Sequence, residues 1–91
     1  MVYAAVLTIV DNEKNAQSRP LHLAYISDLY RAGKVMMGGP FEDGRGGMVI
    51  YQNVDAEEAE RLARQDPAIT SGARTLELRP WRLLDLPIES N

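Results

Sequence analysis

The feature that most constrains the fold is a continuous apolar run near the start of the chain, residues 2–10 (VYAAVLTIV). Its length and its β-branched residues predict a strand rather than a helix, and Asp11 and Asn12 close it. Side chains of a strand alternate between the two faces of a sheet, and here both sets are apolar. A strand with one face in water would alternate apolar and polar residues. Both faces of this strand are therefore expected to be covered.

The segments that follow predict a helix and then a hairpin. Ser18 is the expected N-cap of a helix that runs to about Ala32, and Gly33 is a suitable residue to follow its end. Residues 35–37 begin a second strand, which the glycines and proline after it are expected to break. A turn cluster then leads to a third strand over residues 47–52, which is expected to pair with the second.

The last part of the chain predicts a second helix and a fourth strand. Asp55 begins a capping-box pattern that opens a helix through Gln65, and residues 73–82 alternate as a strand does. The order strand, helix, strand, strand, helix, strand predicts an α+β, ferredoxin-like βαββαβ fold. This fold has a four-stranded antiparallel sheet with two helices on one face. Because the other face is left bare, we expect homodimerisation through the sheet faces.

Composition restricts the classes of function. The 91 residues form one domain, and 10 Lys and Arg against 13 Asp and Glu give a net charge of −3, which argues against nucleic acid or an anionic membrane as partner. The apolar run is too short to span a membrane and has no basic leader, so a cytoplasmic location is expected. Without cysteine, HExxH or a ligand cluster, neither a metal nor another cofactor is expected.

Two residues could carry chemistry, and each has a structural and a functional interpretation. His22 is the sole histidine and falls within the apolar stripe of the first predicted helix. It could be a core histidine bonded to a backbone carbonyl or a general acid–base group in a pocket. Asp66 precedes Pro67, so it could be a turn carboxylate or the partner that orients His22.

Four further residues are candidate substrate contacts. Arg19 lies one helical turn from His22 and could bind an anion, although a solvated arginine is common at such a position. Gly39 and Pro40 fit neither phosphate-binding pattern, and a bulge and hairpin explain them structurally; their functional use would be to let the backbone approach a ligand. Asp43 fits a solvated turn, and it is kept as a candidate contact in the same hairpin.

A set of short motifs in a particular order resembles the YciI-like (YCII-related) family over residues 1–83, leaving residues 84–91 as a C-terminal tail. The motifs are Arg19-x-x-His22, Gly33, Gly39-Pro40-Phe41-x-Asp43-Gly44, Gly46-Gly47, Asp66-Pro67 and Arg79-Pro80-Trp81. The resemblance implies the dimeric α/β-barrel variant of the ferredoxin-like fold. It also implies an active site with a His–Asp pair, which by position would be His22 and Asp66.

Two hypotheses about function follow. The first is a cofactor-independent enzyme in which His22 moves a proton on a small organic substrate and Asp66 holds its tautomer. Its reaction would be an isomerisation, an elimination or another lyase-type step, because no nucleophile or cofactor motif is present. The second is a non-catalytic, dimeric small-ligand-binding or accessory module in which His22 is a polar anchor.

Overall fold

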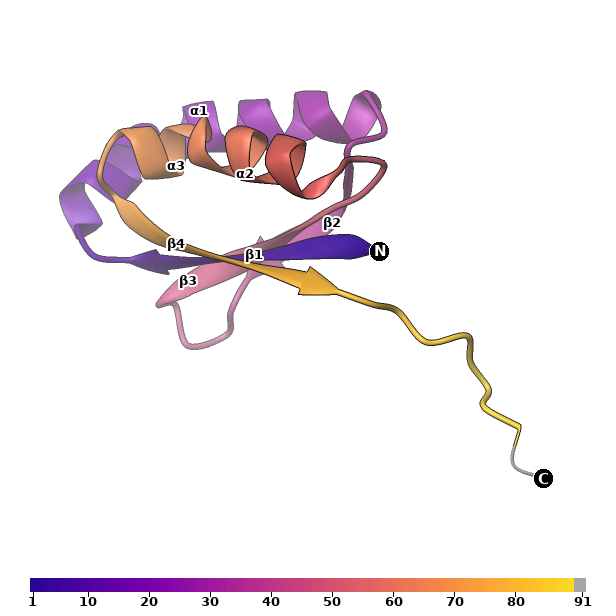
Figure 1. The fold of residues 1–91 in the computed structure, drawn as a ribbon. Helices are drawn as coiled ribbons and strands as arrows, with labels where there is room; N and C mark the ends of the chain where they lie inside the picture. The colour runs from indigo at the N-terminus through magenta and orange to yellow at the C-terminus, as the bar shows by residue number, and fades with distance from the viewer. Residues whose placement is uncertain (90–91) are drawn as a thin grey trace.

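The computed structural model describes residues 1–89 and has the expected ferredoxin-like fold. Its sheet is antiparallel with strand order β2-β3-β1-β4, so β1 and β3 are central, and the helices lie on one face (Figure 1). The elements in chain order are β1 (Val2–Ile9), α1 (Asn12–Arg31), β2 (Val35–Pro40), β3 (Gly46–Tyr51), α2 (Ala56–Arg64), α3 (Pro67–Thr70) and β4 (Arg74–Trp81). The short helix α3 is an addition to the two predicted helices.

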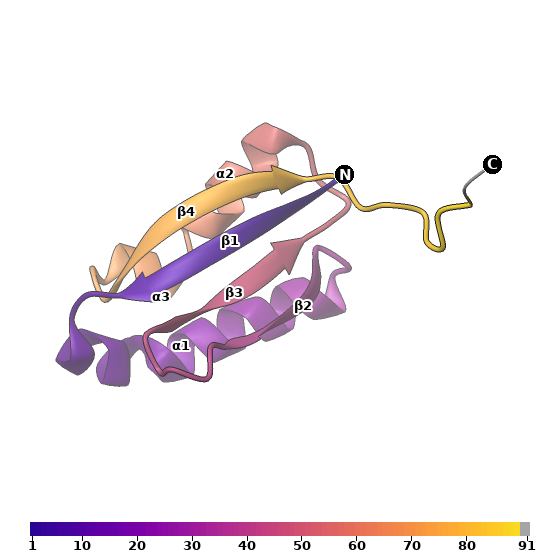
Figure 2. The same cartoon turned by 90° about the horizontal axis from the view of Figure 1, so that it is seen from below.

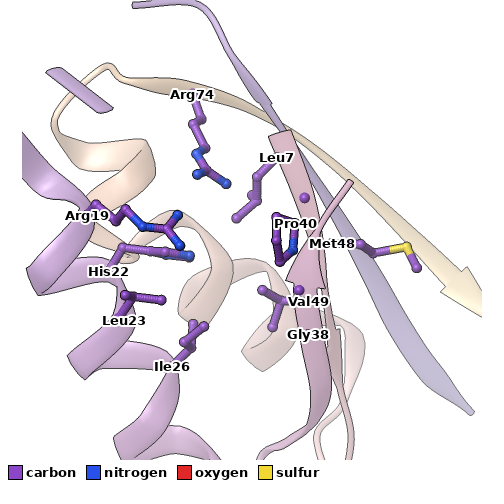
Figure 3. Close-up of a pocket in the computed structure, with 12 residues that line it drawn as sticks. Leu7, Arg19, His22, Leu23, Ile26, Gly38, Pro40, Met48, Val49 and Arg74 are labelled. Atoms are coloured by element: carbon purple, nitrogen blue, oxygen red, sulfur yellow. The ribbon is translucent and has the colours of Figure 1, made fainter. Parts of the chain in front are cut away.

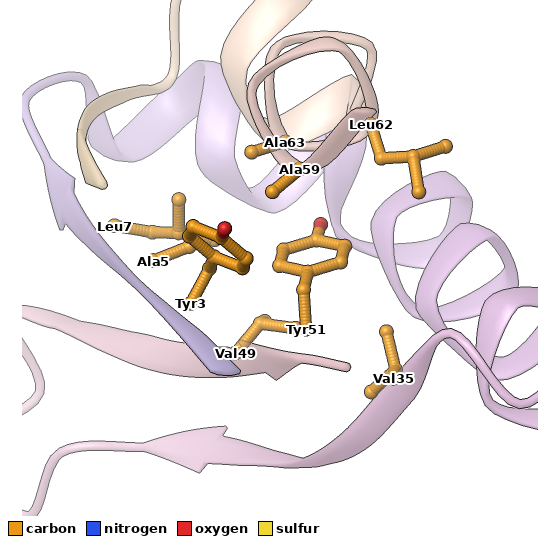
Figure 4. Packing of buried hydrophobic residues seen from close by; sticks show 9 residues of the cluster. All are labelled: Tyr3, Ala5, Leu7, Val35, Val49, Tyr51, Ala59, Leu62 and Ala63. Carbon is orange, nitrogen blue, oxygen red and sulfur yellow. The ribbon is translucent and has the colours of Figure 1, made fainter. Parts of the chain in front are cut away.

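The main core lies between the sheet and the helices (Figure 4). Tyr3, Ala5 and Leu7 alternate along β1 and face this core, as the period of a strand requires. On α2, Ala59 and Ala63 are fully buried against the sheet. Because alanine adds little bulk, these two positions let α2 pack close to the strands.

The opposite face of the sheet carries no helix (Figure 2). Val2 and Ala4 of β1 and Ile50 of β3 form a second apolar cluster there, with Met36 and Met48 packed against it. The predicted two-sided character of β1 is thus confirmed: one set of its side chains enters the main core, and the other lies on the helix-free face.

The expected start of the first helix at Ser18 is wrong. Helix α1 begins at Asn12, with Asp11 as its N-cap, and the Asp11 carboxylate accepts a hydrogen bond of 3.0 Å from the Lys14 backbone N–H. Residues 12–17 are mostly polar and show no apolar stripe, so periodicity does not reveal them as helical. Proline is most common in a first turn, yet Pro20 lies inside the helix.

The second strand also continues further than predicted. Strand β2 runs through Gly38 and Gly39 to Pro40 instead of being broken after residue 37. Proline is tolerated here because β2 is an edge strand. A Cβ on Gly47 of β3 would lie 2.6 Å from the Gly39 carbonyl oxygen, so this pairing requires a glycine at position 47.

The corrected helix start leads to a paired stability prediction. Asp11→Ala is expected to lower the free energy of unfolding by about 1 kcal/mol, because it removes the cap of α1. Ser18→Ala is expected to leave it unchanged or raise it, since the Ser18 side chain is buried and its hydroxyl lacks a partner within residues 1–89. Urea unfolding of both variants checks this. A larger loss for Ser18→Ala than for Asp11→Ala would contradict the observed capping.

The segment after β4 forms no helix or strand over residues 82–89 and extends away from the domain (Figure 1). Leu84, Leu86 and Ile88 are exposed there. The predicted tail spans residues 84–91, of which residues 90–91 lie outside the described part of the chain. No helix within residues 1–89 is both long enough and apolar enough to cross a membrane.

Candidate functional site

The buried polar centre of the molecule is the contact between His22 and Asp66. Nδ1 of His22 lies 2.7 Å from Oδ1 and 2.9 Å from Oδ2 of Asp66. The two residues are 5% and 1% exposed, so water competes little for this contact. The structural interpretation of His22 expected a bond to a backbone carbonyl, but its partner in the structure is the carboxylate of Asp66.

Local sequence explains how Asp66 is held. Asp66 follows Gln65, the C-cap of α2, and has extended backbone angles, as a residue before proline favours. It is the N-cap of α3, and its Oδ1 accepts a hydrogen bond of 2.9 Å from the Ala68 backbone N–H. Asp66 and Pro67 therefore lie where α2 ends and α3 begins. The carboxylate is fixed from its own chain segment as well as by His22.

The contact with Asp66 determines which nitrogen of His22 is available. An ionised carboxylate can only accept hydrogen bonds, so Nδ1 carries a hydrogen and its N–H donates a hydrogen bond to Asp66. In the neutral ring, Nε2 then holds the lone pair. His22 lines a pocket between α1 and the sheet (Figure 3). The pair thus presents one basic nitrogen beside a cavity.

This pocket has a volume of about 200 Å³, which suits a small molecule. Its walls are mainly apolar side chains and glycine backbone from α1, β1, β2 and β3. The lining residues are Leu7, Arg19, His22, Leu23, Ile26, Gly38, Gly39, Pro40, Gly47, Met48, Val49 and Arg74. A Cβ on Gly38 would come within 3.1 Å of the Met48 carbonyl oxygen and 3.5 Å of a Val49 methyl, so glycine keeps this wall open.

The structure brings most of the predicted site residues together. Arg19, Gly39 and Pro40 line the pocket with His22, and Asp66 lies behind the histidine. Asp43 does not line it: its exposed carboxylate accepts a 2.9 Å hydrogen bond from the Arg45 backbone N–H in the turn between β2 and β3. This matches the turn interpretation of Asp43.

Sequence reasoning missed Arg74. Arg74 begins β4 and lies on the same face as Leu76 and Leu78, which pack against the main core. The sequence did contain a signal for it: Arg74 precedes Leu76 and Leu78 at intervals of two, which places a charged side chain on the same face as two core leucines. Its Nε–H donates a 2.8 Å hydrogen bond to Oδ1 of Asn15, which lies in the part of α1 that was not predicted to be helical.

The negative charge of Asp66 also acts on two tyrosines, the partly buried Tyr25 and the buried Tyr51. Burial, and then the negative charge of Asp66, raise the pKa of Tyr25 and of Tyr51. The Tyr25 hydroxyl donates a 2.8 Å hydrogen bond to the Leu62 carbonyl. Both phenols therefore stay protonated at neutral pH, which leaves His22 as the basic group of this region. Within residues 1–89, no group of three His, Cys, Asp or Glu side chains could hold a metal ion.

Three comparisons show which known proteins this chain resembles. The model of the YCII-related domain family matches residues 1–82. YjpA of Bacillus subtilis (strain 168), described as uncharacterized, is 28% identical over 78 residues, which is 86% of this chain and 92% of YjpA. The structure of 5-chloro-2-hydroxyhydroquinone dehydrochlorinase (TftG) from Burkholderia phenoliruptrix AC1100, in complex with 2,5-dihydroxybenzoquinone, aligns with a TM-score of 0.74 at 19% identity, covering 90% of this chain and 94% of TftG.

Proposed function

Since the chain belongs to the YCII-related domain family, as its motifs predict, we propose that it is a cofactor-independent enzyme in which His22 and Asp66 perform acid–base chemistry on a small organic substrate. The observation that carries the proposal is the 2.7 Å contact between Nδ1 of His22 and the buried carboxylate of Asp66, with the ring at a cavity wall. A histidine in a wholly structural role has no need of a cavity beside it.

The proposed reaction begins with proton transfer to Nε2 of His22. The substrate C–H or O–H bond breaks, and its electron pair moves into a new double bond. Asp66 stabilises the imidazolium that forms and holds the ring in one orientation. The electron pair then either expels a leaving group, which is an elimination, or takes the proton back at another atom, which is an isomerisation.

Fold similarity supports the elimination type among these reactions. TftG is named as a dehydrochlorinase, and its structure contains 2,5-dihydroxybenzoquinone, a small planar molecule. Loss of hydrogen chloride requires a base for the proton, the role proposed here for His22. We further propose Arg19, Gly39 and Pro40 as substrate contacts, since all three line the pocket. Nothing in the geometry supports a substrate contact for Asp43.

The function is tested with two readouts on the unmodified protein. One is chloride release from 5-chloro-2-hydroxyhydroquinone. The other is exchange of C–H for deuterium in D₂O, followed by NMR, in a panel of hydroxyquinones and 1,3-dicarbonyl compounds. We expect at least one compound to react well above the uncatalysed rate. If compounds bind but none reacts or exchanges, the non-catalytic ligand-binding module is the correct interpretation.

The helix-free face of the sheet is the proposed site of homodimerisation. Val2, Ala4 and Ile50 are already buried on this face, and the partly buried Met36 and Met48 that pack against them are its more accessible apolar side chains. Trp81 of β4 pairs with Val2 and is half-exposed, so apolar surface continues to the edge of the face. A second copy of the same sheet would cover this surface, and a small domain gains stability from such burial.

Val6→Lys tests the dimer. Val6 lies on the helix-free face opposite Met48 on one side and Glu77 on the other. The lysine would find a carboxylate within the monomer but would place a charge inside a dimer interface. We expect a dimer for the wild type at micromolar concentration in sedimentation, and a shift to monomer for Val6→Lys but not for Gln17→Lys on the exposed side of α1. A compact wild-type monomer would refute the proposal.

A further inference from the structure

Arg74 is a buried cation without a counter-ion among the described residues. It is 7% exposed, and its Nε–H donates a hydrogen bond to Oδ1 of Asn15. None of the ion pairs within residues 1–89 includes Arg74. A neutral amide oxygen does not balance a guanidinium charge, and buried charges are normally paired. The protein thus holds a charge here whose partner is not part of its own described chain.

A second guanidinium stands at the same pocket. Arg19 lines the cavity from α1, and Figure 3 shows its side chain and that of Arg74 both reaching toward the space beside His22. Arg19 forms no ion pair within the described residues. Burial, and then the positive charge of Arg19, lower the pKa of Arg74, whereas the charge of Asp66 acts in the opposite direction.

The charges at this site do not cancel. Arg19 and Arg74 contribute two positive charges and Asp66 one negative charge, and His22 adds a further positive charge whenever it is protonated. The Asp66 carboxylate is already engaged by Nδ1 of His22 and the Ala68 N–H. The cavity is therefore positive in either protonation state of His22. An anion that enters it would relieve the repulsion between the two guanidinium groups.

From this geometry we propose that Arg74 and Arg19 form a subsite that binds the anionic oxygen group of the substrate, a small carboxylate or an ionised enol or phenol. The guanidinium of Arg74 keeps terminal N–H groups for such an oxygen, because only its Nε–H is used by Asn15. Leu7, Ile26 and Val49 form apolar walls for the body of the molecule. The inference rests on the proposed function only in calling the bound anion a substrate.

The same arrangement places the anion next to the base. His22 and both arginines line one cavity of about 200 Å³, so an oxygen held by the arginines lies near Nε2 of His22. When a proton is removed from the substrate, negative charge spreads toward that oxygen, and the guanidinium groups stabilise it. Asn15 is then a positioning residue: it holds Arg74 through a single hydrogen bond and does not line the pocket.

The test measures binding of anions and of their neutral analogues by NMR. The probes are acetate, benzoate and 2,5-dihydroxybenzoquinone, with acetamide and benzamide as uncharged counterparts. The Arg74 Nε–H signal is the reporter, because its hydrogen bond to Asn15 slows exchange with water. We expect the anions to shift this signal at millimolar concentrations and the amides to leave it in place. No shift with any anion would overturn the proposal.

Variants at Arg74 and Asn15 test the effect of the Arg74 charge on anion binding, and a variant on α2 is the control. Because the variants at position 74 lack the Nε–H reporter, binding to all variants is followed through the backbone N–H signals of Gly38 and Gly39, which line the pocket. Arg74→Met is expected to weaken the binding of the anion that binds the wild type by roughly tenfold or more, and Arg74→Lys by less. Asn15→Asp is nearly isosteric and still accepts from Nε–H, yet it neutralises Arg74, so it too should weaken anion binding. Arg64→Met, which removes one exposed positive charge on α2, should not. Unchanged affinity in Asn15→Asp and Arg74→Met, with both variants folded, would refute the subsite.

The two proposals can fail separately. If anion binding depends on Arg74 but no compound is turned over or exchanged, the subsite is supported and the proposed enzymatic function is refuted. If turnover depends on His22 but not on Arg74, the enzymatic function is supported and the substrate-binding role of Arg74 is refuted. His22→Gln should retain the preference of the pocket for anions over amides, since both arginines remain.

Discussion

Replacing His22 with glutamine is expected to lower the rate of proton exchange or chloride release by about 10²- to 10⁴-fold, the usual contribution of a positioned general base. The glutamine amide nitrogen is one bond further from the backbone than Nδ1, and its N–H can still supply a hydrogen-bond donor for Asp66. It has no basic nitrogen to replace Nε2. The loss should therefore appear in kcat, with little change in the stability of the fold.

The measurement is the deuterium exchange assay under saturating substrate, with a thermal melt of each variant. Tyr25→Phe is the matched control, because it removes a hydroxyl that bonds to Leu62 but does not line the pocket. Its rate should stay close to that of the wild type. Added imidazole should restore part of the rate to His22→Ala, where the cavity left by the ring can admit it. Wild-type kcat in His22→Gln would rule out the proposed base.

Replacing Asp66 with alanine is expected to give the largest loss of stability, about 2–5 kcal/mol in the free energy of unfolding. The change leaves two buried donors without a partner, Nδ1–H of His22 and the backbone N–H of Ala68. It also removes the N-cap of α3. Asp66→Asn keeps an oxygen that can accept from one of the two donors, so its stability should lie between that of the alanine variant and the wild type.

Urea unfolding at one protein concentration compares these variants, because any dimer would make stability depend on concentration. Asp55→Ala is the matched control: Asp55 caps α2 through a hydrogen bond from the Glu58 N–H and is exposed, so its loss should cost only about 1 kcal/mol. Asp66→Asn should also react slowly, since an amide cannot stabilise the imidazolium as a carboxylate does. If Asp66→Ala costs no more than Asp55→Ala, the His22–Asp66 contact contributes nothing to the fold.

Local sequence patterns were sufficient to predict most of the helices and strands, because each of these elements depends mainly on residues that are close in sequence. The apolar run at residues 2–10 predicted a strand with two apolar faces, and β1 has apolar side chains on both faces of the sheet. The position of His22 in an apolar stripe predicted an inward-facing ring, and it is 5% exposed. The polar segment at residues 12–17 has no such stripe, so the first turns of α1 were missed.

The sequence by itself determined the order and type of the main elements, the inward direction of His22 and the stop at Asp66-Pro67, since backbone sterics and hydrophobic periodicity act over a few residues. Only the tertiary structure decided that Asp66 meets His22, 44 positions away, and that Arg74 reaches the same cavity as Arg19. Those contacts exist because the sheet brings α1, α3 and β4 together. Packing of distant segments leaves no local pattern, and for that reason the charge of the pocket emerged only in three dimensions.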